Sequence, residues 1–220
     1  DIDGIEPGCT IEVTEEQPSF GVSSEMIGRV LDGNGKPIDG KGPIPLGTKY
    51  PLMGTPLNPL SRQRSSNSLD VGVKSINGLL TCAKGQRIGI MAGTGVGKSV
   101  LLGMIARNTE AEINVIALIG ERGREVKEFI EENLGPDGLK RSIVIAAASD
   151  QPPLVRLRGA FIATTIAEYF RDQGKDVLLM MDSITRFALA QREIGLSVGE
   201  PPTTKGYPPS TFSMLPKILE

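Results

Sequence analysis

Residues 89–99 read GIMAGTGVGKS, and this stretch decides what kind of fold to expect. It follows a run typical of a short strand, residues 86–91, and precedes an apolar run with helical spacing, residues 100–108. Glycines let such a loop turn its backbone N–H groups toward an anion, and the following helix adds partial positive charge at its N-terminus. The order strand, glycine-rich loop, helix therefore predicts a phosphate-binding loop, although Ala92 stands where the usual pattern begins with glycine.

The predicted ligand of this loop is a nucleotide with Mg²⁺. Lys98 is expected to bring a positive charge to the β- and γ-phosphates, and the Ser99 hydroxyl is expected to bind the metal. The alternative is a glycine-rich turn beside a surface lysine, which requires neither the strand before the loop nor the helix after it. The predicted nucleotide contacts are Gly93, Thr94, Gly95, Val96, Gly97, Lys98, Ser99 and Val100.

The composition narrows the class of protein. Of the 220 residues, 39% are hydrophobic but only 4% are aromatic, so the core must be mainly aliphatic. The net charge of −2 argues against a nucleic-acid surface, and the absence of histidine excludes a histidine-based catalytic triad. Cys9 and Cys82 are expected to be buried free thiols. No signal peptide or membrane-spanning run is expected, and we interpret the chain, which starts on Asp1, as a fragment.

The pattern along the chain predicts three parts. Residues 1–45 have short strand-like runs around the turn signal Asp32-Gly33-Asn34-Gly35 and are expected to be the C-terminal part of a small N-terminal β-barrel. Residues 43–62 carry five prolines, a density that disfavours regular structure, and residues 46–75 are expected to be a linker that wraps the next domain. Residues 76–220 alternate between strands and helices and predict a mainly parallel α/β domain of the P-loop NTPase type. Its further strands are expected at 114–119, 142–147 and 176–181, and its further helices at 124–133 and 155–173.

Two acidic residues follow predicted strands at the edge where the phosphates would lie. Asp182 ends the run VLLMMD and is expected to hold Mg²⁺, although it could also cap the next helix. Glu121 follows the strand ending at residue 119 and can align the water that attacks the γ-phosphate, although it could simply favour a helix N-terminus, as could Glu125. Arg122 and Arg186 can offer charge-assisted hydrogen bonds to phosphate oxygens.

Together these motifs resemble the catalytic ATPases of the rotary ATP synthase family, and within them the ATPases of flagellar and type III protein export. The resemblance also rests on residues 150–153 (DQPP), 182–187 (DSITRF) and 206–210 (GYPPS), and on stretches typical of the export ATPases at 121–129, 169–174 and 188–195. A synthase β-subunit would be expected to have threonine in place of Ser99 and Gly123.

The resemblance implies a RecA-like core that binds ATP and Mg²⁺, with Glu121 as the catalytic glutamate and Arg122 and Arg186 beside the γ-phosphate. It implies a homohexameric ring in the cytoplasm, peripheral to the inner face of the bacterial membrane, which works with export-apparatus, stalk and regulator proteins and with export substrates and their chaperones. The arginine finger, the adenine-stacking residue and a C-terminal helical domain would lie beyond Glu220. Open alternatives are a β-like subunit of a proton-translocating ATP synthase, a non-catalytic nucleotide-binding subunit and an RNA-translocating helicase.

Overall fold

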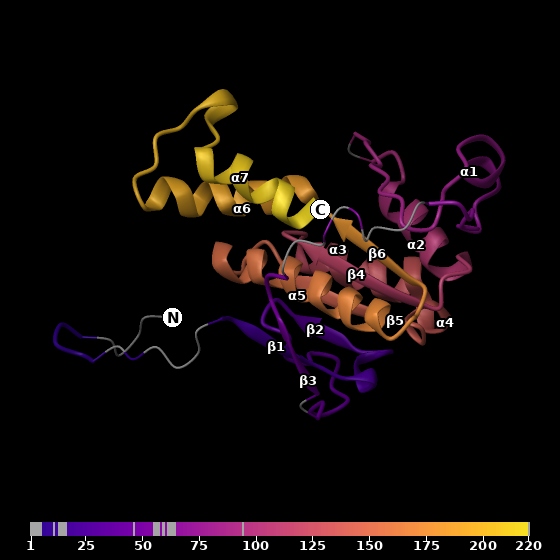
Figure 1. Cartoon of the computed structure of the whole chain (residues 1–220), viewed down its shortest axis with the longest axis horizontal. Helices are drawn as coiled ribbons and strands as arrows, with labels where there is room; N and C mark the ends of the chain where they lie inside the picture. Colours follow the sequence, from indigo (N-terminus) through magenta and orange to yellow (C-terminus); the bar gives the residue numbers. More distant parts are fainter. Residues whose placement is uncertain are drawn as a thin grey trace.

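The centre of the molecule is a parallel sheet of four strands, as the computed structural model shows (Figure 1). The structure describes residues 6–10, 12, 17–45, 47–54, 58, 60, 65–93 and 95–219. The strand order is β2 (Val30–Asp32), β5 (Ser142–Ala147), β4 (Ile113–Ile119), β6 (Val177–Asp182), and each neighbouring pair is parallel. This arrangement confirms the expected α/β class with a mainly parallel sheet.

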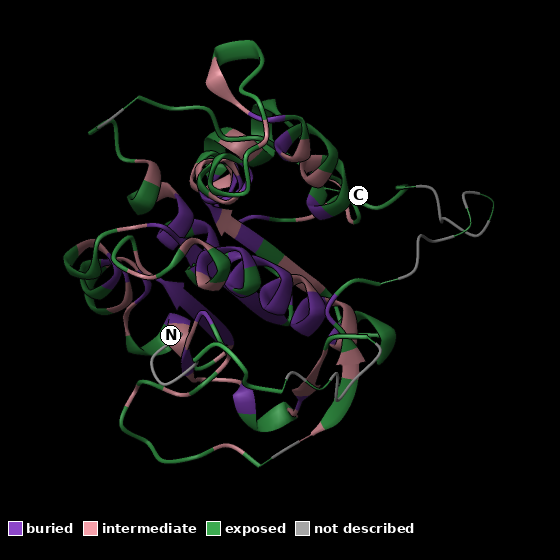
Figure 2. Cartoon of the chain, turned by 90° about the vertical axis from the view of Figure 1, so that its left-hand side faces the viewer, coloured by how far each residue is buried: buried purple, intermediate pink, exposed green. Residues whose placement is uncertain are grey.

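The two faces of this sheet are covered by different helices, which explains why its central strands are continuous apolar runs. All seven residues of β4 are buried (Figure 2). Val115 and Ala117 of β4 pack toward the long helix α5 (Pro153–Asp172), whereas Ile116 and Leu118 share the opposite core with α2 (Lys98–Asn108). A strand covered on both faces has no polar alternation, and its boundaries can be read from the sequence within a residue.

The helical segment after β4 differs from the single helix predicted at 124–133. It begins as α3 (Gly123–Glu128), continues through a π-helical turn, η3 (Phe129–Leu134), and ends as the short α4 (Gly135–Leu139). A side chain at Gly103 of α2 would lie 2.5 Å from the Asn133 carbonyl oxygen, so α2 and η3 are in close backbone contact there. The π-helical turn depends on such tertiary contacts and has no periodic signal in the sequence.

After β6 the chain forms α6 (Ile184–Ser197), a short 3₁₀ turn, η4 (Thr204–Gly206), and α7 (Pro209–Leu219). Figure 1 shows α6 and α7 together above the first half of α5. The rings of Phe161 on α5 and Phe187 on α6 pack edge to face with centroids 5.9 Å apart. The short α-helix α1 (Lys74–Leu79) precedes the phosphate-binding loop.

The N-terminal part contributes to both sheets of the molecule. After β1 (Ser19–Val22) come a 3₁₀ turn, η1 (Ser24–Met26), and then β2, and β1 pairs antiparallel with β3 (Thr48–Pro51). The turn at residues 32–35 is confirmed, with Gly35 N–H donating to the Asp32 carbonyl at 3.0 Å and a φ of 82° at Gly35. The division at residue 45 stays a prediction, but β2 lies inside the expected barrel segment and pairs with the α/β sheet.

The expectation that the proline-rich residues 43–62 lack regular structure is wrong for β3. Tyr50 pairs with Phe20, and Pro51 occupies the last strand position, where a residue without an N–H is tolerated at a sheet edge. Residues 46, 55–57, 59 and 61–64 of the expected linker lie outside the described part of the chain.

The strand expected at residues 86–91 is absent: these residues are described but form no ladder, and Ile88 and Met91 are 54% and 96% exposed. Within the described residues β6 pairs only with β4 and is an edge of the sheet. The alternation of residues 86–91 is typical of a strand, but a strand forms only where a partner edge is aligned with it.

The two cysteines are free, but only Cys82 is buried, so the expectation that both are buried is wrong for Cys9. Within the described residues, no helix is both long enough and apolar enough to cross a bilayer.

Candidate functional site

The phosphate-binding loop leads directly into helix α2. Gly97 caps that helix with a φ of 91°, and Gly95 has a φ of 77°, a region that residues with a side chain rarely adopt. A Cβ atom built on Gly93, Gly95 or Gly97 meets no atom within 4 Å, so one side of the loop backbone is open. Thr94 lies outside the described residues. The loop therefore presents backbone N–H groups at a helix N-terminus, as anion binding requires.

Lys98 at the start of α2 is paired with Asp182 at the end of β6. The Lys98 ammonium donates a hydrogen bond to Asp182 Oδ1, and Asp182 is almost completely buried. The alternative role of Asp182 as a helix cap does not hold, because Ser183 is the N-cap of α6 and its hydroxyl accepts from the Arg186 N–H at 3.4 Å. Asp182 is thus a buried carboxylate whose counter-ion is the lysine of the phosphate loop.

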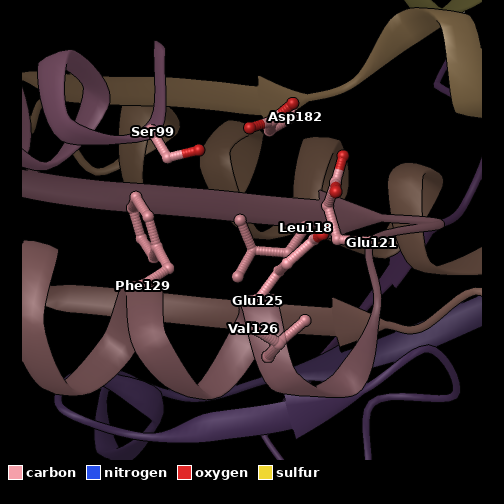
Figure 3. A pocket seen from close by; sticks show the side chains of 7 residues that line it. All are labelled: Ser99, Leu118, Glu121, Glu125, Val126, Phe129 and Asp182. Atoms are coloured by element: carbon pink, nitrogen blue, oxygen red, sulfur yellow. The ribbon is translucent and has the colours of Figure 1, made fainter. Parts of the chain in front are cut away.

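A small cavity of about 60 Å³ lies between these residues and α3 (Figure 3). In Figure 3 the Ser99 hydroxyl and the Asp182 carboxylate approach this space from two different elements, and the Glu121 carboxyl extends toward Asp182. Mg²⁺ prefers oxygen ligands, is held by one or two protein groups and keeps several waters or phosphate oxygens. The Ser99 and Asp182 oxygens, with open space beside them, fit such an ion.

The backbone of Glu121 is held by the segment that follows β5. The Gly120 N–H donates to the Ala147 carbonyl at 2.7 Å, and the Ser149 N–H donates to the Glu121 carbonyl at 2.9 Å. Gly120 has a φ of 70°, and a Cβ there would lie 2.8 Å from Arg186 Cβ. Only glycine allows this approach, so the chain turns sharply after β4 and directs Glu121 to the cavity.

Burial raises the pKa of Glu121 to about 7, and its hydrogen bond with Glu125 and the nearby Asp182 carboxylate act in the same direction. The same hydrogen bond lowers the pKa of Glu125, whose side chain is 37% exposed, against 17% for Glu121. The two carboxyls therefore share a proton, which resides on the more buried Glu121 because the charged form is costlier there. Near neutral pH, Glu121 can both hold and release a proton.

The two arginines occupy different positions around Glu121. The Nε atom of Arg186, on α6, lies 4.0 Å from Glu121 Oε1. Arg122 is 71% exposed and its Nη1 atom lies 3.4 Å from Glu125 Oε1, at the rim of the site. Of the predicted site residues, the structure brings together Lys98, Ser99, Glu121, Asp182 and Arg186. Arg122 lies at the rim and does not line the cavity. Val96 and Val100 are exposed, on the loop and on α2.

Four residues that line the cavity were not predicted as site residues: Leu118, Glu125, Val126 and Phe129. Phe129 lies one turn after Glu125 and Val126, and this spacing is the signal that could have identified them. The contact of Glu125 with Glu121 could not be read from spacing, because it depends on the bend at Gly120.

Comparison with known proteins places the chain in a family. The ATP synthase alpha/beta family, nucleotide-binding domain, matches residues 72–220. The chain is 58% identical to the flagellum-specific ATP synthase of Pseudomonas aeruginosa over 217 residues, covering 99% of the chain and 48% of that protein. It is also 58% identical to that of Bacillus subtilis, over 98% of the chain and 49% of the relative. The chain therefore spans about half the length of these curated relatives.

Solved structures agree with this assignment. A prototypical ATPase from the type III secretion system of pathogenic bacteria superposes with a TM-score of 0.86 at 50% identity, covering 92% of this chain and 58% of the other. EscN, an assembled type III secretion ATPase from enteropathogenic E. coli solved with its central stalk EscO, gives 0.86 at 52% identity, over 91% of this chain and 50% of EscN. The match of residues 72–220 to the nucleotide-binding domain and the identity to these relatives show that the chain belongs to the ATP synthase alpha/beta family.

Proposed function

We propose that the protein carrying this chain hydrolyses ATP with Mg²⁺ to energise flagellar or type III protein export. The observation that carries the proposal is that Ser99, Asp182 and Glu121 line one cavity while Lys98 pairs with Asp182. The names of the relatives, flagellum-specific ATP synthases and type III secretion ATPases, support the export role.

The phosphate-binding residues act through charge and geometry. Lys98 and the open backbone of residues 93–97 hold the β- and γ-phosphates, so phosphate and Asp182 compete for the Lys98 ammonium. Ser99 and Asp182 hold the metal, which when bound neutralises charge on the phosphate oxygens. In phosphoryl transfer the protein contributes mainly such positioning and electrostatic stabilisation.

Glu121 orients the attacking water and can accept its proton. A carboxyl with a pKa of about 7 is matched to this role near neutral pH. Arg186 favours the charged form of Glu121 and can donate to a phosphate oxygen. Arg122 at the rim is 71% exposed and can exchange its contact with Glu125 for one with the γ-phosphate.

The working assembly that we propose is a homohexameric ring, in which a neighbouring subunit supplies an arginine finger and an aromatic residue stacks on adenine. The EscN structures, an assembled ATPase with a central stalk, support a ring and a stalk partner. Regulators, export substrates and chaperones are the other proposed partners, and the proposed location is the cytoplasmic face of the bacterial membrane.

The alternative is a catalytic subunit of a proton-translocating ATP synthase, which would use the same chemistry. Ser99 and Gly123, where such a subunit is expected to have threonine, favour the export ATPases. A non-catalytic subunit could dispense with Glu121, and an RNA helicase is disfavoured by the net charge of −2.

The test is MgATP turnover of the whole protein, alone, over a range of protein concentrations. Specific activity that rises cooperatively with concentration supports a ring made of one chain type, and Glu121→Gln should then abolish turnover while nucleotide binding persists. Activity that requires a second, homologous subunit would favour the synthase alternative. Near-normal turnover of Glu121→Gln would overturn the catalytic assignment.

A further inference from the structure

Within the described residues two charged residues are buried when the whole residue is considered: Asp182, inside the nucleotide site, and Arg156, outside it. Arg156 lies in the first turn of α5 and is 9% exposed. Its Nε donates to the Gln151 carbonyl at 3.1 Å, and its Nη2 donates to Glu193 Oε2 on α6 at 2.5 Å. A buried guanidinium that makes two such bonds joins two segments in a fixed geometry.

The first of these segments holds the backbone of Glu121. Gln151 ends a turn in which its N–H donates to the Ala148 carbonyl at 3.1 Å. In the same turn the Ser149 N–H donates to the Glu121 carbonyl at 2.9 Å. The position of Glu121 is therefore linked to Arg156 through a four-residue turn.

The second segment carries Arg186. Glu193 lies seven residues after Arg186 on α6, which places both on one face of the helix. Arg186 contacts the Glu121 segment at two points, because its Nε lies 4.0 Å from Glu121 Oε1 and its Cβ packs against Gly120. Figure 1 shows α6 beside the start of α5, so the contacts form a closed ring from Glu121 through Arg156 and Glu193 to Arg186 and back to Glu121.

We infer that the Arg156–Glu193 ion pair is a positioning element that sets the separation between Glu121 and Arg186 in the nucleotide site. Neither residue lines the cavity, so both act through other groups. Glu193 is 52% exposed, so solvent screens the pair, and its contribution to stability is smaller than that of a pair buried on both sides, although the Arg156 side chain is 10% exposed. The packing of Phe161 against Phe187 holds α5 to α6 independently of the ion pair. The main effect of the ion pair is therefore on the relative position of Glu121 and Arg186 and not on stability. The inference rests on the proposed ATP hydrolysis.

The test compares Glu193→Ala with Glu112→Ala in the whole protein. Glu112 is a matched control, because its side chain is 47% exposed and pairs with Lys175 at 2.8 Å near the opposite ends of the strands. We expect Glu193→Ala to lower kcat about tenfold while KM for MgATP matches that of Glu112→Ala and the urea midpoint falls only slightly below it, since small misplacements cost rate more than binding. Glu193→Gln, which keeps an acceptor oxygen for Arg156, should recover most of the loss.

Arg156→Lys is the second variant, because it keeps the charge but cannot bond Gln151 and Glu193 as a fork. We expect the double variant Arg156→Lys, Glu193→Ala to be no slower than the slower single variant, as for two residues that act as a unit. Unchanged kcat in Glu193→Ala, a change in KM alone, or a parallel loss of stability and activity would each overturn the inference. Loss of turnover in Glu121→Gln, measured alongside, tests the proposed function separately.

Discussion

Replacing Glu121 with glutamine should stabilise the protein without nucleotide above pH 7 and change its stability little at pH 5. A pKa of about 7, against 4.5 for the free side chain, corresponds to at most about 3 kcal/mol of unfavourable interaction with the charged form. Two features reduce this figure: the carboxyl is 17% exposed, and the hydrogen bond that holds its proton lowers the pKa of Glu125. We therefore expect Glu121→Gln to gain about 1–2 kcal/mol at pH 8.

The sign follows from proton binding. Because the pKa of Glu121 is raised in the folded state, the folded protein binds more protons than the unfolded chain between pH 4.5 and about 7. The contribution of this carboxyl to the free energy of unfolding therefore falls as pH rises through that window and is constant above it. Glutamine cannot ionise, so this pH-dependent loss should be missing in the variant.

Urea unfolding at pH 5, 6, 7 and 8 measures the difference between the two proteins. Glu132→Gln, at an exposed position on η3, is the control for removing one negative charge. A Glu121→Gln variant that is no more stable than the natural protein at pH 8, or whose advantage is the same at pH 5, would refute a carboxyl held protonated by burial.

Three further predictions concern the same site. Lys98→Ala should abolish nucleotide binding in a titration with a fluorescent ATP analogue and destabilise the protein by about 1–3 kcal/mol in urea, because the buried Asp182 loses its counter-ion. The value of kcat/KM should rise with pH through about 7 as Glu121 ionises in the protein without nucleotide, and a flat profile from pH 6 to 8 would contradict a role for its carboxylate. Gly120→Ala should lower both the unfolding midpoint and kcat, since the new methyl group would lie 2.8 Å from Arg186 Cβ at a φ of 70°; unchanged values of both would show that the turn can relax.

The secondary structure of the central sheet was predictable because its strands are buried on both faces. β4 and β5 are continuous apolar runs, and the structure places them within one residue of the predicted bounds. Residues 86–91 differ from these runs: their strand-like alternation is not a buried apolar pattern, they have no aligned partner edge, and they form no strand. β2 is a strand that joins a sheet where none was expected: its three residues, expected in the barrel domain, pair with β5 of the α/β sheet.

For the site, the local sequence predicted residues that the structure brings together. Lys98 and Ser99 begin a helix after glycines with positive φ, and Glu121 and Asp182 lie at strand ends on the same edge of the sheet. Their catalytic roles stay predictions. These positions depend on turns and strand ends, which short segments encode.

The interactions between these groups depend on tertiary structure alone. The shared proton of Glu121 and Glu125, the pairing of Lys98 with Asp182 and the ring closed by Arg156 and Glu193 each join residues from different elements. A hydrogen bond or a pKa depends on separations of a few ångströms and on burial. Such separations arise only when helices and strands pack, and no spacing along the chain contains them.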